Sequence, residues 1–346
     1  ANGTKEKHTN SWSDVFVKEE GCEYQLDFRK VYWNSRLGGE HRRLVQLIKK
    51  DAVARSKEKG KESSATKVVV ADLMAGIGPF AIPLTAKNLI RGNSKKQTKK
   101  NKNKDNNDNN NTDKGEKDCS LPIEVYANDL NPSSYEFLVE NANRNKCDFE
   151  TNKNFVDYCS DQSYSLHVSN MDARAHCHRL QDERIRPDHF IMNLPATALE
   201  FLDCFRGYPD DTNKANDGDG EQQQQQSPRP RIHVHCFAAK DPEASKTEIW
   251  KRAETSLGCP LDEDRDQAQL HTVRDVAPNK NMYCLSFLLP AAAYALPRIQ
   301  LGPDTPKEGE KSEAKPEANQ EQKRERSEED ADTGSGTESK KQKKAE

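Results

Sequence analysis

Apolar residues from Lys67 onwards fall into short buried runs that alternate with longer periodic stretches. The short runs predict strands at 67–76 (KVVVADLMAG), 123–129 (IEVYAND), 165–172 (SLHVSNMD), 189–193 (HFIMN) and 231–239 (RIHVHCFAA). The periodic stretches predict helices at 79–90, 132–145, 198–205 and 242–257. Strands that alternate with helices favour a parallel sheet covered on both faces.

The two ends of this pattern differ from its middle. Residues 271–290 read as two extended runs joined by a Pro-Asn-Lys-Asn turn, which predicts a hairpin, and residues 12–28 also read as strands. The sequence therefore predicts an α/β fold in which an antiparallel C-terminal hairpin closes a parallel sheet. That order is expected of a Rossmann-like class I methyltransferase sheet, rather than of six successive βα units.

Polar residues are concentrated in three segments. The hydrophobic fraction of the whole chain is only 33% and its charged fraction 32%. We interpret a Lys/Asn-rich insert (93–118), a Gln-rich insert (210–230) and a charged tail (299–346) as disordered, because they offer almost nothing to bury. The remainder, roughly 250 residues, is enough for one α/β domain at 51–298 and a short leader at 1–50.

Charge and cysteine content narrow the class of protein. A formal net charge of −3 argues against binding nucleic acid by bulk charge. Nine cysteines without a C-x-x-C pair indicate reduced thiols inside a cell, and no run of 18 apolar residues predicts a membrane span. The segment Ala-His-Cys-His (175–178) resembles a metal motif but lacks a second ligand pair, so no metal is expected. A basic KKQKK run (340–344) fits a nuclear import signal or an ordinary charged tail.

A glycine-rich turn follows the first parallel strand. Gly76, Gly78 and Ala81 match G-x-G-x-x-A, in which the glycines let a ligand approach the backbone and the next helix offers its N-terminus. Asp129 ends the second strand, 51 residues after Gly78, or 25 once the 26-residue insert is subtracted. A ribose-binding acid is expected about 20 residues on, so the spacing fits NAD and S-adenosylmethionine alike.

Further features favour S-adenosylmethionine. Asp72, four residues before Gly76, would repel a pyrophosphate but suits a sulfonium or an ammonium, and Pro79 removes an amide donor that a diphosphate could use. Asp172 ends the third strand with a carboxylate able to accept from an adenine amino group. A cap or a solvated turn would explain each acid singly, but Asn193 adds a polar side chain at the end of a fourth strand. The cofactor site is expected to comprise Asp72, Gly76, Gly78, Asp129, Leu130, Asp172, Ala173 and Asn193.

Several segments together resemble one family, the eukaryotic and archaeal tRNA (guanine-37-N1) methyltransferases. They are VYWNSRLGGEHRRLV (31–45), DLMAGIGPFAIP (72–83), NDLNPSSYEFLVENANRNK (128–146), NMDAR (170–174) and IMNLPATALEFLD (191–203). The resemblance covers about residues 12–298 without the inserts. The family's N-terminal tRNA-docking domain is not recognised, so we expect a fragment or a processed product whose first 50 residues end an RNA-binding or linker region.

The resemblance implies methyl transfer from S-adenosylmethionine to N1 of guanosine 37, beside the anticodon. Its implied partner is the anticodon stem-loop of tRNA, with no membrane, and the implied state is a monomer in the cytoplasm, nucleus or mitochondrial matrix. Methylation at this position supports reading-frame maintenance and is the first step towards wybutosine in tRNA-Phe.

The resemblance also implies roles for individual residues. Guanine N1 must lose a proton as the methyl arrives, which requires a base near N1 and a cation or donor near O6. Glu40 matches the family's general base, Arg36 an arginine of the target pocket, and His41 the edge of the cofactor site. Spacing alone favours a simpler interpretation, a surface ion pair between Arg36 and Glu40.

The target base is expected at the end of the fourth strand. Methyltransferases that act on exocyclic amines carry Asn or Asp, then Pro-Pro and an aromatic residue there, whereas Asn193, Leu194 and Pro195 are followed here by Ala196. The resemblance implies that Asn193, Leu194 and Pro195 hold a guanine whose ring nitrogen is methylated. Tyr32 or its neighbour Trp33 can stack on a flipped base, although packing of the leader onto the domain is an equally good interpretation.

Three rival functions remain. An aminocarboxypropyl transferase of the wybutosine pathway would use the same cofactor, but Glu40 and the Asn-Leu-Pro sequence at 193–195 argue against it. An NAD dehydrogenase would need a His or Lys near a hydride acceptor, and the sequence places none there. An RNA-binding module without cofactor would leave the acids at the strand ends without a purpose.

Overall fold

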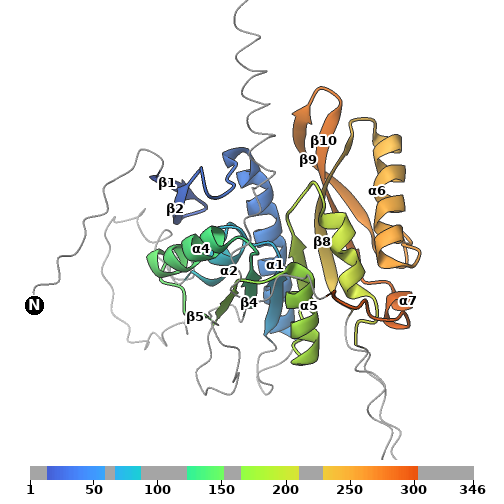
Figure 1. Cartoon of the computed structure of the whole chain (residues 1–346), viewed down its shortest axis with the longest axis horizontal. Coiled ribbons are helices and arrows are strands. Elements are labelled where there is room, and N and C mark those ends of the chain that lie inside the picture. The colour runs from blue at the N-terminus through green and yellow to red at the C-terminus, as the bar shows by residue number, and fades with distance from the viewer. Residues whose placement is uncertain (1–13, 59–66, 87–122, 152–164, 210–228, 303–346) are drawn as a thin grey trace, which may run out of the picture. The chain divides into compact units, whose positions relative to one another are not determined.

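The computed structural model describes residues 14–58, 67–86, 123–151, 165–209 and 229–302, which form an eight-stranded sheet and a separate two-stranded hairpin (Figure 1). The strands are β1 (Asp14–Glu19), β2 (Cys22–Asp27), β3 (Val68–Asp72), β4 (Ile123–Asn128), β5 (Phe149–Thr151), β6 (Leu166–Ser169), β7 (His189–Met192), β8 (Arg231–Ala239), β9 (Gln269–Ala277) and β10 (Lys280–Leu288). The helices are η1 (Ser35–Leu37), α1 (Gly38–Glu58), α2 (Ala81–Thr85), α4 (Pro132–Arg144), α5 (Ala173–Asp182), η2 (Ala198–Phe205), α6 (Pro242–Leu257) and α7 (Ala291–Tyr294).

The sheet has the order β5-β6-β4-β3-β7-β8-β10-β9. Its strands pair in parallel from β5 to β8, and β10 then pairs antiparallel with both β8 and β9. The predicted α/β fold with a parallel sheet and a C-terminal hairpin is therefore confirmed. The chain proceeds outward from β3 in one direction to β4 and β6, then returns to the other side of β3 for β7 and β8.

Four local features differ from the prediction, and the helices η1, α1 and α7 were not predicted either. The edge strand β5 is only three residues long, too short for a periodic signal, and α5 follows β6 where the sequence analysis placed no helix. The predicted helix at 198–205 is a 3₁₀ helix, η2. The helix predicted at 79–90 is shorter within the described residues, as α2 spans Ala81–Thr85.

Each face of the sheet is covered by its own apolar core. One core joins buried residues of α1, α2 and α4 to Val70, Val125 and Ile191 of the strands. The other joins α5, η2 and α6 to Phe190, Met192 and other strand residues of opposite parity. Because side chains alternate between faces along a strand, Asp72 and Asn193 belong to the face of Val70 and Ile191, which is the face that α1 covers.

Two asparagines fix the β1–β2 hairpin to helix α4. Asn141 Oδ1 accepts from the backbone N–H of Gln25 at 2.7 Å, and its Nδ2 donates to the Gln25 carbonyl at 3.2 Å. Asn145 makes the same pair of bonds with Glu23, at 2.9 and 2.7 Å. Residues four apart on a helix share a face, so α4 pairs with the edge of β2 much as a neighbouring strand would.

Several sequence predictions concern segments that lie mostly outside the described residues. Most of the two inserts and most of the charged tail, with its KKQKK run, lie there. Over the ranges that the structure covers, no helix combines the length and apolar character needed to cross a membrane. The seven cysteines within those ranges are all free.

Candidate active site

The strand order brings the polar strand ends to one edge of the sheet. Because β6, β4, β3 and β7 are parallel neighbours, their carboxyl ends, which precede or contain Asp172, Asp129, Asp72 and Asn193, lie in sequence along it. The chain changes direction between β3 and β7. The carboxyl edge at such a switch point is where open α/β sheets bind ligands.

The glycine-rich loop after β3 offers few amide donors to a ligand. The N–H of Gly76 donates to Asp129 Oδ2 at 2.8 Å, those of Ala75 and Gly78 donate to backbone carbonyls at 2.7 and 2.9 Å, and Pro79 has none. A diphosphate site of the dinucleotide type relies on such amides. The loop therefore suits a ligand without phosphate groups.

The two glycines of the loop serve different purposes. Both have positive φ, +56° at Gly76 and +96° at Gly78, which favours glycine. A Cβ at Gly78 would lie 2.6 Å from Leu138 Cδ1 and 2.7 Å from Ile82 Cγ1, so this glycine lets the loop pack against the helices. A Cβ at Gly76 would meet nothing within 4 Å, so the backbone there faces open space that a ligand can approach.

Asp72 is fully buried at the end of β3, and neither carboxylate oxygen has a hydrogen-bond partner. Burial, with the nearby charge of Asp129, raises the pKa of Asp72 from 3.8 to about 8, although the Met74 backbone N–H nearby acts in the opposite direction. An orphaned buried carboxyl is costly unless a ligand completes it. A positively charged ligand would do so, as the sequence predicts.

Asp129 and Asp172 are held in fixed orientations by backbone amides. Asp129 accepts from Gly76 through Oδ2 and from the Asn131 N–H through Oδ1 at 2.9 Å, and burial raises its pKa. Asp172 caps α5, with Oδ1 accepting from the N–H groups of Arg174 and Ala175 at 2.9 and 3.2 Å. Asp172 is therefore an N-cap, as the alternative interpretation of the sequence held, but the cap leaves its Oδ2 without a hydrogen bond among the described residues. Ala173 is buried beside it, and Leu130 is exposed beside Asp129.

Asn128 braces these strand ends and was missed by the sequence analysis. Its Nδ2 donates to the carbonyls of Leu73 and Met171 at 3.2 and 2.9 Å, and its Oδ1 accepts from Ser169 Oγ at 3.0 Å and the Met171 N–H at 3.1 Å. It thereby links β4 to the segments that follow β3 and β6. Only its position directly before Asp129 could have singled it out.

Glu40 is buried, with a side chain only 2% exposed. Its carboxylate accepts from Arg43 Nε at 2.6 Å and Nη2 at 2.7 Å, and lies 2.8 Å from His235 Nε2. Arg36, in contrast, is exposed on η1. Glu40 is therefore not the surface acid that the simpler interpretation of the spacing assumed. Arg36 lies on the 3₁₀ turn η1, whereas Glu40 lies in the first turn of α1.

Electrostatics within this cluster hold Glu40 charged. Burial alone would raise the pKa of Glu40, but Arg43 and His235 outweigh it and hold the pKa at about 2. Burial alone would lower the pKa of His235, but Cys284 and Glu40 beside it raise the pKa to about 10. Glu40 thus lies as a carboxylate between two cations on the α1 face of the sheet. His235 and Arg43 were also missed, although alternating histidines in the apolar run RIHVHC were a visible signal.

The same cluster contains three potential metal ligands. Donor atoms of Glu40, His235 and Cys284 all lie within 4.8 Å of one another. Arg43 already bonds both oxygens of Glu40, and a second cation there would be repelled. We therefore assign no metal to it.

The leader residues divide between packing and exposure. Trp33 is buried against Tyr24, with ring centroids 5.3 Å apart, so it packs the leader, whereas Tyr32 remains exposed. His41 is buried, its Nδ1 lies 2.6 Å from Glu19 Oε1, and its ring contacts Phe80 edge-on. His41 thus adjoins the glycine-rich loop through Phe80, while its Nδ1 is engaged by β1.

The loop after β7 carries a second orphaned acceptor. Asn193 Oδ1 is buried without a hydrogen bond, and Leu194 beside it is exposed. The backbone of the loop is held by Phe237, whose N–H donates to the Pro195 carbonyl at 3.1 Å. Arg252 of α6 adds a longer bond, 3.5 Å, to the Ala196 carbonyl.

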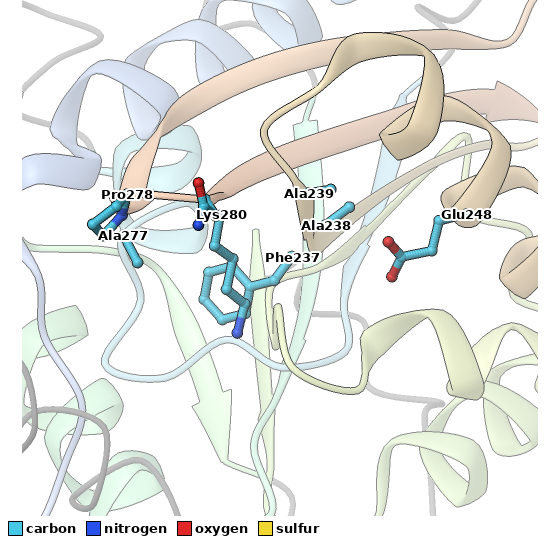
Figure 2. Close-up of a pocket in the computed structure, with 8 residues that line it drawn as sticks. Phe237, Ala238, Ala239, Glu248, Ala277, Pro278 and Lys280 are labelled. Carbon is cyan, nitrogen blue, oxygen red and sulfur yellow. The ribbon is translucent and has the colours of Figure 1, made fainter.

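A cavity of about 460 Å³ adjoins this loop at the carboxyl end of β8 (Figure 2). Phe237 lines it together with Lys280 of β10, whose Nζ lies 4.6 Å from the ring centre, and Glu248 of α6. None of the residues predicted from the sequence lines this cavity. It flanks the row of strand ends rather than forming it.

Comparison with known proteins gives one consistent family of relatives. No protein-family model matches the chain. The tRNA (guanine(37)-N(1))-methyltransferase 1 of Phaeodactylum tricornutum is 42% identical over 305 residues, which cover 87% of this chain and 53% of the relative. The tRNA (guanine(37)-N(1))-methyltransferase of Phytophthora infestans is 33% identical over 295 residues, covering 85% and 52%. The chain spans about half the length of the curated relatives it matches.

Among solved structures, the M. jannaschii tRNA m1G37 methyltransferase matches with a TM-score of 0.44 and 19% identity. The match covers 80% of this chain and 56% of that one. The family resemblance drawn from the sequence is thus confirmed by the sequence relatives.

Proposed function

We propose that this chain, which belongs to the tRNA (guanine(37)-N1)-methyltransferase family, transfers a methyl group from S-adenosylmethionine to N1 of guanosine 37 in tRNA. One observation carries the proposal beyond the resemblance. The carboxyl edge of the sheet combines an orphaned buried carboxyl, Asp72, with an orphaned buried amide oxygen, Asn193, on the face where Glu40 is buried. The first suits a cationic cofactor, the second a hydrogen-bonding base, and the third a proton acceptor.

The cofactor would be held by the ends of β3, β4 and β6. When bound, it supplies the methyl group on a positively charged sulfonium. Asp72 would neutralise positive charge, the free lone pairs of Asp129 would accept from ribose hydroxyls, and Asp172 would accept from the adenine amino group through Oδ2. Leu130 and Gly76 border this space with an exposed apolar side chain and an open backbone. The amides of the loop, already bonded within the protein, argue against NAD, which requires a diphosphate site.

The target guanine would be held at the loop after β7. Asn193 Oδ1 is an acceptor awaiting a donor, and the exocyclic amine of guanine is one. Pro195 restricts the loop that aims Asn193, and exposed Leu194 and Tyr32 offer apolar surface to a flipped base. Arg36 would supply positive charge near O6, where negative charge develops as N1 loses its proton.

Glu40 would accept that proton. It is the carboxylate that the resemblance assigns to this role, and its fixed charge and its hydrogen bonds orient it without solvent. Orientation of this kind is a recognised contribution to general-base catalysis. Its two oxygens are, however, stabilised as the anion, so Glu40 by itself is a weak base.

Partners and location are proposed on the same basis. The anticodon stem-loop of tRNA would be the substrate, and the protein would act as a monomer in the cytoplasm, nucleus or mitochondrial matrix. Free cysteines within the described ranges support a reducing compartment. The product would support reading-frame maintenance and provide the first step towards wybutosine in tRNA-Phe.

The test is a transfer assay with the natural full-length protein and cofactor labelled separately in its methyl and its aminobutyrate part. Methyl label should appear at N1 of guanosine 37, as mapped by nucleoside mass spectrometry, and should be absent from a tRNA with adenosine 37. Aminobutyrate label on the tRNA would instead support the aminocarboxypropyl transferase alternative and refute the proposed reaction.

A further inference from the structure

Glu40 lies over a row of side chains from three adjacent strands. His235 of β8 is the cross-strand partner of Cys284 of β10, which in turn is the partner of His271 of β9. Directly paired residues point to the same face of a sheet, so all three side chains face α1. Both imidazoles reach Glu40: His235 Nε2 lies 2.8 Å from Oε1, and His271 Nε2 lies 3.7 Å from Oε2.

These neighbours differ in their ability to accept a proton. Arg43 holds its proton at all working pH values, and His235, with a pKa of about 10, already carries one. Cys284 Sγ also lies within 4.8 Å of a Glu40 oxygen, but Cys284 is fully buried. Among the described residues, His271 is therefore the titratable neighbour of Glu40 that is open to solvent. Burial lowers the pKa of His271 from 6.5, as do the charges of Arg43 and His235, while Glu40 raises it, so its imidazole is largely neutral at pH 7.

The neighbours also differ in their access to solvent. The side chain of Glu40 is 2% exposed and that of His235 is fully buried, whereas the side chain of His271 is 48% exposed. His271 owes this exposure to its position on β9, the edge strand of the sheet. A proton that reaches Glu40 therefore has a path to water through His271 that the other neighbours do not provide.

We propose that His271 receives the guanine N1 proton from Glu40 and releases it to solvent. The proposal rests on the proposed methyl transfer. As the bond between the methyl carbon and sulfur breaks and the N1–methyl bond forms, the N1 proton passes to Glu40. Glu40 then gives a proton to His271 Nε2, which becomes an imidazolium and loses its proton to water or buffer. Glu40 returns to a carboxylate, and no oxidant or further reactant is required.

The energetics support a relay of two groups. A carboxylate held at a pKa of about 2 is a poor final acceptor at neutral pH, because its anionic form is strongly favoured there. Passing the proton on to His271 returns Glu40 to its favoured carboxylate form and leaves the proton on a side chain that exchanges it with solvent. A small rotamer change of the exposed His271 side chain would shorten the 3.7 Å separation to hydrogen-bond distance.

The variant His271→Gln tests the relay in the natural full-length protein. The single-turnover methyl-transfer rate at saturating tRNA and cofactor is measured from about pH 5 to about pH 8. We expect the wild-type rate to fall on the acid side of an apparent pKa below 6.5. The variant should lose about tenfold or more at pH 7 and should lose this acid limb, with tRNA affinity unchanged. Gln269→Ala, exposed on the same face of β9, is the matched control and should behave as wild type.

A second measurement needs neither cofactor nor tRNA. Nuclear magnetic resonance titration of the His271 ring should show its pKa falling further in Glu40→Gln, because the Glu40 charge raises it. An unchanged His271 pKa would show that the two side chains are not coupled and would overturn the relay.

The outcomes of the kinetic test are separable. A rate within about twofold of wild type in His271→Gln overturns the relay, as does a loss of rate that retains the acid limb. Weaker tRNA binding with a normal saturated rate would overturn it too, and would make His271 an RNA contact instead. If the wild type itself transfers no methyl to guanosine 37, the proposed function fails rather than the relay alone.

Discussion

Replacing Asp72 with Asn should stabilise the folded protein and weaken its affinity for a cationic cofactor. Asp72 is fully buried with both oxygens unpaired, and its pKa rises from 3.8 to about 8 on folding. Between those two values the folded protein retains a proton that the unfolded chain has lost, so stability decreases as pH rises from about 4 to about 8. The amide of the Asp72→Asn variant would not titrate and would remove this pH-dependent penalty.

The size of the expected gain in stability follows from the shift in the pKa of Asp72. At pH 7 the unfolded carboxyl is about three units above its pKa while the folded one is still protonated, which corresponds to about 4 kcal/mol. Because the amide of Asn brings its own unpaired donors into the site, we expect a net gain of about 1–3 kcal/mol. For a domain of this size that is a rise in melting temperature of roughly 3–10 °C.

Two assays check this prediction. Differential scanning calorimetry from about pH 5 to about pH 8 should show a gap between Asp72→Asn and wild type that widens with pH, whereas Glu243→Gln, an exposed acid on α6, should show none. Isothermal titration calorimetry should show about 5- to 150-fold weaker binding of S-adenosylmethionine at pH 8 in Asp72→Asn. A variant that is less stable at pH 8 yet binds the cofactor normally would refute the reasoning.

Other predictions concern the proton acceptor, the cofactor acids and the segments outside the domain. Glu40→Gln should retain cofactor and tRNA affinity while the single-turnover rate falls by roughly 10²–10⁴-fold, and a near-normal rate would remove Glu40 from the mechanism. Asp129→Ala and Asp172→Ala should each weaken cofactor binding by about 1–3 kcal/mol in calorimetry, and normal affinity in both would place the cofactor elsewhere. Asp129→Ala should also lower the melting temperature, because it frees the Gly76 N–H. Deleting the Lys/Asn-rich insert, the Gln-rich insert and the charged tail together should leave the melting temperature within a few degrees, and a large drop would contradict the domain map.

The sequence by itself determined the sheet and the acids along its edge. Buried runs of β-branched residues and the periodic stretches between them indicate strands and helices through local rules of side-chain spacing. Parallel strands in turn align their carboxyl ends, so Asp72, Asp129, Asp172 and Asn193 could be assigned to one edge without coordinates. The strand β5 was missed because three residues are too few for a periodic signal, whereas the helix α5 was missed although its amphipathic pattern is as clear as that of α4.

Only the tertiary structure decided the environment of Glu40. Its partners Arg43 and His235, and its more distant neighbour His271, come from α1, β8 and β9, and the last two are 195 or more residues away in the chain. The spacing of Arg36 and Glu40 suggested a surface pair, whereas the packing of α1 onto the sheet buried Glu40 and left Arg36 exposed. Local sequence specifies which face of a helix a residue occupies, but burial and the resulting pKa depend on which distant strands that face covers. Glu40, which sequence alone would treat as an ordinary surface acid, is thereby a buried carboxylate held between Arg43 and His235.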